Sequence, residues 1–459
     1  MTVLAGGMVA TFAGTGVVGV PLSFVVLAVA LAPLTVGYLA ASRHIPHAAT
    51  AYALLAQGLG RPWGVAGASV ALVAYNAIQI SLYGLLGATL AGLVGGRWWV
   101  WAALAWLVVA LLGVLHIGVN ARVLAFALLT EVVVIAAFDL AAFTHPADGT
   151  VSLAGLDPNR LFVDGVGGVL ALGVAAFVGF ESGPVYGEEA KTGKTVARAT
   201  FAALGFLGLF YAATAWAMTV AVGPYRVVDS ARDPSSGLPF RVLEVHYGIG
   251  VAWLGTAILV TSVIAAMLSF HNGVARYVFA LGRERVLPAV LAHIGSGSRG
   301  GAPVGGSVLQ SAIAAVVVGA VVITDGDPIA LLFTWLSTLA AIGVLVLLAG
   351  CSWAALRFFR RGGGTNEGPF IRSVAPTVGV IAGLAVLATV VANVHALLGV
   401  APGSPLTVIL PGLIAVATLA GLWWAMALRR RRPDVYLAIG RGRPHPLAVL
   451  DHGLADLDV

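Results

Sequence analysis

Charged residues are scarce in this sequence, and their scarcity excludes a water-soluble globular protein. Asp, Glu, Lys and Arg make up 10% of the 459 residues, whereas soluble domains carry about 25%. Hydrophobic residues account for 59%, and the mean hydropathy is +0.98. Charged residues are absent from residues 1–42, 62–96, 98–121, 199–225, 302–324, 328–356 and 373–428. Because about 18 uncharged apolar residues can cross a bilayer as a helix, we predict an all-α polytopic membrane protein.

Cysteine and metal-binding patterns are also missing. The single cysteine, Cys351, rules out an intramolecular disulfide. The ten histidines form neither H-x-x-x-H nor H-E-x-x-H, so the sequence lacks these spacings of zinc enzymes. We therefore expect no metal and no cofactor, and we treat a membrane enzyme as the weaker of the competing hypotheses.

Twelve apolar segments are predicted to span the membrane. They lie at residues 2–13, 17–41, 65–94, 98–116, 121–143, 165–187, 199–223, 248–273, 304–323, 328–356, 374–399 and 405–428. The 59 glycines suit closely packed membrane helices, since small residues let helix backbones approach. Residues 1–428 are therefore predicted to form one transmembrane domain, and residues 429–459 a cytoplasmic C-terminal tail.

The positive charges gather on one side of this arrangement. With both termini in the cytoplasm, the inner loops and the tail hold 20 of the 25 Lys and Arg residues. The other five are Arg97, Arg160, Arg226, Arg232 and Arg241. Because cytoplasmic loops are enriched in Lys and Arg, the count predicts a multi-pass protein of the cytoplasmic membrane with both termini inside. The same count explains the basic pI of about 9.7 by membrane topology and by contact of the basic residues with anionic lipid headgroups. We therefore expect no nucleic acid partner.

Three spans contain residues that interrupt helices: Ala5–Gly7 in span one, Gly179–Pro184 in span six and Ser269–Gly273 at the end of span eight. A helix stays broken in a membrane only where its backbone is buried in protein or lines a cavity. In span six, Pro184 removes a backbone donor and Glu181 adds a charge at membrane depth. Interrupted segments at matching positions of two halves indicate a transporter's binding site. For the paired glycines of span one, a close contact between helices is the simpler alternative.

Three segments, in order along the chain, resemble permeases of the amino acid–polyamine–organocation superfamily. AAFVGFESGPVYGEEAK (175–191) resembles the family's sixth helix, YLAASRHIPHAATAYALLAQGLGRPWG (38–64) the segment after its second helix, and ARYVFALGRERVLP (275–288) the exit of its eighth. The resemblance implies two inverted five-helix repeats, spans 1–5 and 6–10, followed by two C-terminal helices, with helices one and six discontinuous. It also implies transport of an amino acid by alternating access.

Three departures accompany this resemblance. The family's P-x-R-x-x-P after the sixth helix is replaced by KTGKTVARA, and Arg285 stands where the family has Gly. Only four residues precede Ala5, where the family has half a helix. Either the start of the sequence lies too far downstream, or the protein lacks this half-helix, and the second alternative keeps open a membrane sensor that moves no solute.

The resemblance implies that main-chain groups at the two breaks hold the substrate. N–H groups would bind its carboxylate at Ala5, Gly6 and Gly7, since the N-terminus of a half-helix carries partial positive charge. Carbonyl groups would bind its ammonium at Phe177, Val178 and Gly179. Aromatic lids would come from Phe180, Phe270 and Trp335, with ordinary core or lipid-facing packing as the alternative.

Ionisable residues at membrane depth are functional candidates. Glu131, in span five, is predicted to carry the coupling proton, or else to serve as a structural partner for polar groups of span one or eight. His271 is the second coupling candidate. Glu181 is expected to orient the broken backbone or to reach a polar partner on a neighbouring span. Glu188 and Glu189 are expected to gate the inner side by pairing with inner-loop arginines, or else to form a solvated helix end.

These observations favour a proton-coupled secondary transporter, a symporter, for an amino acid. An exchanger of amino acids or polyamines is the alternative, and the sequence leaves sodium coupling and the oligomeric state open. Glu181 is the only acidic residue evident in the predicted pocket, so we expect a neutral amino acid rather than a polyamine.

Overall fold

Nine helices in the described part of the chain are long and apolar enough to cross a bilayer. The computed structural model describes residues 1–115, 117–186, 193–233, 236–295 and 301–442, and all elements in these ranges are helical. Six of them are α2 (Val20–Ser42), α4 (Arg61–Val94), α9 (Gly193–Val222), α12 (Ile249–Arg283), α13 (Val304–Ile323) and α17 (Leu406–Arg431). The other three join neighbouring elements: Val166–Pro184 contains α8 (Val166–Phe177), Pro328–Arg360 contains α14 (Trp335–Arg360), and Phe370–Ala392 contains α15 (Ala375–Ala392). Together, the nine confirm an all-α polytopic membrane protein.

Further apolar helices occupy the other three predicted spans. They are the π-helical segment η1 (Thr2–Met8) with α1 (Val9–Thr15), then α5 (Trp98–Gly113) and α6 (Ile117–Thr144). Short elements connect or extend the long ones: α3 (Thr50–Gly58), η2 (Ala154–Leu156), α7 (Pro158–Leu161), α10 (Val227–Arg232), α11 (Phe240–Tyr247), η5 (Ala289–Ala292), η7 (Pro328–Thr334), η8 (Phe370–Val374), α16 (Val394–Leu398) and α18 (Pro433–Ala438).

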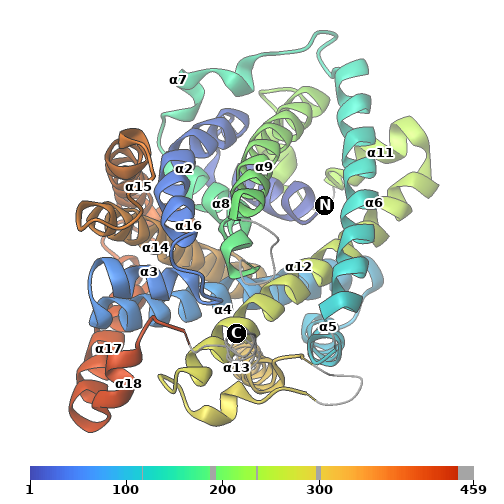
Figure 1. Cartoon of the computed structure of the whole chain (residues 1–459). Helices are drawn as coiled ribbons and strands as arrows, with labels where there is room; N and C mark the ends of the chain where they lie inside the picture. Colours follow the sequence, from blue (N-terminus) through green and yellow to red (C-terminus); the bar gives the residue numbers. More distant parts are fainter. Residues whose placement is uncertain (116, 187–192, 234–235, 296–300, 443–459) are drawn as a thin grey trace, which may run out of the picture.

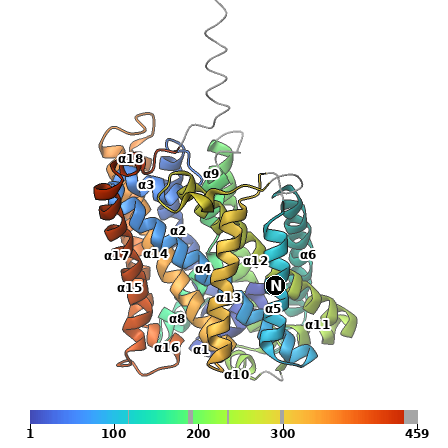
Figure 2. The ribbon, with the colours of Figure 1, turned by 90° about the horizontal axis from the view of Figure 1, so that it is seen from below.

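The helices form one bundle with two distinct ends. Figure 2 shows α3 and α18 at one end and α10 and α11 at the other. We call the end with α3 and α18 the basic end, because Arg43, Arg283 and Arg361 follow or finish helices there. Across the bundle, α15 and α17 lie on one side and α5 and α6 on the opposite side (Figure 1).

Small residues let the central helices approach closely, as expected from the glycine content. Helix α4 packs against α14, α17, α12 and α5. A Cβ added to Gly343 of α14 would lie 2.7 Å from the Cβ of Ala74, and one added to Gly421 of α17 would lie 2.5 Å from the Cα of Ala66. Any larger residue would push these helices apart, so the glycines set the spacing around α4.

The break predicted in span six is present. Helix α8 ends at Phe177, and Val178 leaves the helical region with φ −54° and ψ 128°. Gly179 follows with φ 110°, a conformation open to glycine and strained for other residues. The chain then continues as a 3₁₀ helix, η3 (Phe180–Tyr186), instead of an α-helix.

The break predicted in span eight is wrong. Helix α12 runs without interruption from Ile249 to Arg283, through Ser269–Gly273. No proline lies in this stretch, so every residue keeps a backbone donor for the helix. A lone glycine at 273 weakens a helix without ending it.

The break predicted in span one also differs from the structure. Ala5, Gly6 and Gly7 are wound into the π-helical η1, which leads directly into α1. A Cβ on Gly6 would lie 2.7 Å from Cδ2 of Leu85. Gly6 therefore makes a close contact with α4, which was the simpler of the two sequence interpretations.

A buried carboxylate attaches the C-terminal part of the described chain to the basic end. Glu284, directly after α12, is 4% exposed. It accepts hydrogen bonds from His47 over 2.9 Å, from the Tyr52 hydroxyl, and from the N–H groups of Gly440 over 3.1 Å and Gly442 over 2.8 Å. Burial raises the pKa of Glu284, but these hydrogen bonds and the charge of His47 outweigh burial and hold the pKa below its usual 4.5.

Candidate functional site

A cavity of about 550 Å³ opens beside the break between α8 and η3. Its wall is mostly apolar, with Leu172, Ala175, Ala176 and Leu207 among the contributors. Hydroxyl groups in the wall belong to Thr2, Tyr75, Ser182, Tyr211, Ser262, Ser269, Tyr277 and Ser337. Glu131 supplies a carboxylate, and no Lys or Arg occurs among the described residues that line the cavity.

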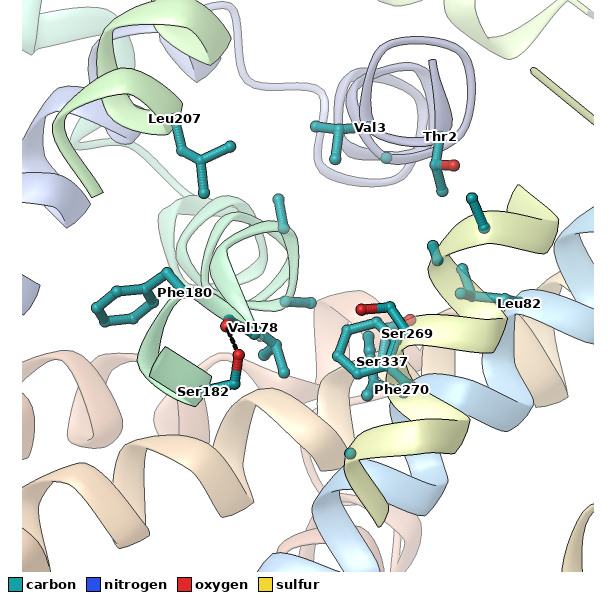
Figure 3. A pocket seen from close by; sticks show the side chains of 18 of the residues that line it. Thr2, Val3, Leu82, Val178, Phe180, Ser182, Leu207, Ser269, Phe270 and Ser337 are labelled. Atoms are coloured by element: carbon teal, nitrogen blue, oxygen red, sulfur yellow. Dashed lines mark hydrogen bonds between the residues drawn. The ribbon is translucent and has the colours of Figure 1, made fainter. Parts of the chain in front are cut away.

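Gly179 stands at the turning point of the broken helix. Its carbonyl oxygen accepts hydrogen bonds from the N–H of Ser182 over 3.0 Å and from the Ser182 hydroxyl over 2.6 Å. Figure 3 shows Val178 and Ser182 on this segment and Ser269 and Phe270 on α12, all in the cavity wall. The break is therefore a cavity-lining structure, as expected for broken helices in membranes.

Glu181 fixes the shape of this break. Its side chain is buried, and one oxygen, Oε2, accepts from the N–H of Gly179 over 2.9 Å. The other, Oε1, accepts from the hydroxyl of Tyr75 on α4 over 2.8 Å. Glu181 thus both orients the broken backbone and reaches a polar partner on a neighbouring span, the two roles considered for it from the sequence.

The predicted aromatic lids fall in different places. Phe180 and Phe270 line the cavity, and a Cβ on Gly179 would lie 3.5 Å from the Phe270 ring. Trp335 is not part of the wall, which instead contains Phe333, two residues earlier. Phe177 lies behind the wall, in edge-to-face contact with Tyr211 and close to the ring of Phe24.

The two coupling candidates are separated. Glu131 lines the cavity, and its Oε2 accepts a hydrogen bond from the Ser262 hydroxyl of α12 over 2.8 Å. Its Oε1 contacts the amino group of Met1. His271 lies outside the wall, where Nε2 bonds the Ser307 hydroxyl of α13 over 2.6 Å. Only Glu131 is therefore in direct contact with the cavity.

Some of the remaining predicted residues line the cavity and others do not. In span one Gly7 lines the cavity, with Thr2 and Val3, but Ala5 and Gly6 do not. Val178 and Gly179 line it from the α8 break. Glu188 and Glu189 lie outside the described residues.

On α12 the sequence identified Phe270 but missed the hydroxyl groups of Ser262, Ser269 and Tyr277 on the same side of the helix. Ser262, Ser269, Phe270, Gly273 and Tyr277 all line the cavity. Their spacings of three, four, seven and eight residues place them on one face of a helix, a pattern that is readable in the sequence. The expected break at Ser269–Gly273 obscured it.

Comparison with known proteins agrees with a transport site. The described residues contain no cluster of three or more His, Cys, Asp or Glu that could hold a metal ion. A search of curated proteins finds no match to the chain. A family model described as amino acid permease matches residues 1–418, which include the α8 break and all the residues that line the cavity. The chain therefore belongs to the amino acid permease family.

Proposed function

We propose that this permease is a secondary active transporter that carries a neutral amino acid across the cytoplasmic membrane by alternating access. The observation that carries the proposal is the broken helix at Gly179, held by Glu181 and Tyr75 and open to the cavity. Broken helices at such sites bind substrates through main-chain groups. Membership of a permease family favours transport over catalysis.

The ammonium group of the substrate binds at the end of α8. The last carbonyls of a helix lack donors within the helix and carry partial negative charge. The N–H of Val178 bonds the carbonyls of Val174 and Ala175, and Ser182 occupies the carbonyl of Gly179. Because Phe177 lies behind the wall and Val178 lines it, we assign the ammonium to the carbonyl of Val178, with the Glu181 carboxylate nearby.

The carboxylate group of the substrate lies on the side of Gly7. Of the three glycine-rich positions predicted for this role, Gly7 is the one in the cavity wall. The hydroxyl group of Thr2 lines the cavity too and can donate to a carboxylate, whereas the Ser262 hydroxyl already donates to Glu131. A neutral amino acid fits best, because apolar residues dominate the rest of the wall.

Glu131 carries the coupling proton in this proposal. A carboxylate at membrane depth is a functional candidate, and this one bonds Ser262 of α12. Loss or gain of its proton changes that bond, and α12 also carries Phe270 against Gly179. Protonation of Glu131 can thus change how α12 packs against the broken helix at Gly179.

The membrane arrangement completes the proposal. The basic end faces the cytoplasm, since Lys and Arg concentrate on the inner side of membrane proteins. Spans 1–5 and 6–10 form the two inverted repeats, and α5 and α6 cross the membrane with the nine long helices. The C-terminus is cytoplasmic, whereas η1–α1 begins at membrane depth, where Met1 contacts Glu131.

A ligand screen on the purified protein tests this function. Amino acids and amines are added one at a time, and the melting temperature is measured. A neutral amino acid should raise it, because a ligand that binds the folded state stabilises that state. If only polyamines stabilise the protein, the substrate assignment is wrong, and if no amino acid or amine does, the binding site is wrong.

A further inference from the structure

Two arginines from different helices share one tyrosine ring at the basic end. Arg61 begins α4, Arg429 lies in the last turn of α17, and Tyr436 belongs to α18. The guanidinium carbon of Arg61 is 5.6 Å from the centre of the Tyr436 ring, and that of Arg429 is 6.0 Å from it. Each contact is attractive, because the face of an aromatic ring carries partial negative charge. Together they bring two like charges to a single side chain.

Positive charge exceeds negative charge around this ring. Residues 429–432 are all arginine, and Asp434 is the single acidic residue in 429–442. Neither Arg61 nor Arg429 forms an ion pair with an Asp or Glu of the described residues. Like charges repel one another, and a bound anion removes that repulsion. The pair of arginines is therefore suited to an anionic ligand.

The start of α4 adds to the attraction for an anion. The residue that caps this helix is Gly60, which has no side chain to bond the N–H groups of the first turn. The first N–H groups of a helix lack partners within it, and the helix dipole gives this end partial positive charge. An anion that binds Arg61 thus also meets a favourable backbone field.

The arginine pair lies where lipid headgroups are found. Helices α4 and α17 are both long enough to span a bilayer, so the start of one and the end of the other lie at the membrane surface. Figure 1 shows α17 and α18 at the periphery of the bundle. Trp63 and Trp423 are exposed on the same two helices, and tryptophan is enriched at the interface between membrane and water.

We propose that Arg61, Arg429 and Tyr436 form a binding site for the phosphate group of an anionic phospholipid. Guanidinium groups bind phosphate oxygens through paired hydrogen bonds, and the ring between them positions both side chains. The bound lipid joins α4 to α17 and α18. None of the three residues lines the cavity, so the site is separate from the broken helix and does not depend on the proposed transport function.

The test compares two phospholipids added to the full-length protein in detergent micelles. Phosphatidylglycerol carries a net negative charge, whereas the choline group of phosphatidylcholine neutralises its own phosphate. A lipid that binds the folded state raises the melting temperature, so a titration gives the affinity for each. Two basic residues near an anionic lipid should give about a thirtyfold preference for phosphatidylglycerol. Equal affinities in the wild type would overturn the site.

Arg61→Gln combined with Arg429→Gln should remove this preference. Arg429→Gln alone, at an exposed position, should weaken it about fivefold. It is a second variant that leaves the start of α4 intact. An undiminished preference in Arg429→Gln would contradict the site.

Arg160→Gln is the matched control for Arg429→Gln. Arg160 lies 5.3 Å from the centre of the Tyr225 ring, next to α10 at the opposite end of the bundle. Both variants lose one positive charge and one contact with a tyrosine ring, but Arg160→Gln should keep the full preference for phosphatidylglycerol. An equal loss in both would assign the effect to net charge alone. Inorganic phosphate is the last arm, and stabilisation by phosphate equal to that by phosphatidylglycerol would overturn the lipid assignment.

Discussion

The hydroxyl of Tyr75 donates a hydrogen bond to Glu181 Oε1, while Oε2 of the same carboxylate accepts from the N–H of Gly179. One side chain thus links α4, which packs through the centre of the bundle, to the turning point of the broken helix. The carboxylate is buried, so removal of either donor leaves part of it unsatisfied.

Tyr75→Phe should therefore loosen the break. Loss of the donor to a buried carboxylate costs about 1–3 kcal/mol, and substrate affinity should fall because the α8 carbonyls are less well positioned. Thermal unfolding and ligand titration measure the two effects. Tyr225→Phe is the control, because Tyr225 is 80% exposed. Equal stability and affinity in Tyr75→Phe and the wild type would show that the link is dispensable.

Gly179→Ala should weaken substrate binding about 5- to 150-fold through backbone strain. The φ of 110° is unfavourable for alanine, at a cost of about 1–3 kcal/mol, whereas the added Cβ has room at 3.5 Å from Phe270. Gly273→Ala is the matched control in the same wall, since its Cβ would meet nothing within 4 Å and α12 is helical there. Unchanged affinity in Gly179→Ala argues against main-chain recognition at the break.

Glu131→Gln should uncouple uptake from the proton gradient while exchange of substrate continues. A gradient of one pH unit stores about 1.4 kcal/mol, enough for about tenfold accumulation when one proton accompanies each substrate. Accumulation in proteoliposomes under such a gradient is the measurement. Glu244→Gln on α11 is the control, since Glu244 pairs with Arg241 on the surface. Gradient-driven accumulation by Glu131→Gln would return Glu131 to a structural role.

Acid should release the C-terminal residues from the basic end. Because the fold holds the pKa of Glu284 below 4.5, its contribution to stability is complete above pH 4.5 and is lost as pH falls through the lowered pKa. Hydrogen exchange at Gly440 and Gly442 should therefore rise below pH 4.5, after correction for intrinsic rates.

Glu284→Gln tests the origin of that acid response. The variant should show faster exchange at both glycines above pH 4.5 and a flatter pH dependence below it. Glu367→Gln is the control, since Glu367 pairs with Arg43 at the same end without contacting residues 439–442. An unchanged pH profile in Glu284→Gln would assign the attachment to packing alone.

The sequence predicts much of this fold because a membrane imposes strong rules on composition. Uncharged runs locate the long helices. Pro184 and Gly179 locate the break in span six, because proline lacks a backbone donor and glycine accepts the positive φ that the chain has at residue 179. The sequence also places Glu181 at this break. A buried charge must find donors, and the Tyr75 hydroxyl supplies one.

Glycine alone proved ambiguous, for a physical reason. Gly6 serves a close approach to Leu85 and Gly273 stands in open space within a continuous helix, yet both resemble helix breaks in the sequence. The local sequence also does not show which side chains point into the cavity. Phe333 rather than Trp335 lines the cavity, a difference set by how the π-helical η7 turns before α14.

Uptake of a radiolabelled neutral amino acid into proteoliposomes tests the central claim most directly. The account predicts uptake above protein-free liposomes for the wild type and for Gly273→Ala, and much weaker uptake for Gly179→Ala at equal protein incorporation. Equal uptake by all three proteins, or no uptake of any amino acid by the folded wild type, would contradict transport through the broken helix at Gly179.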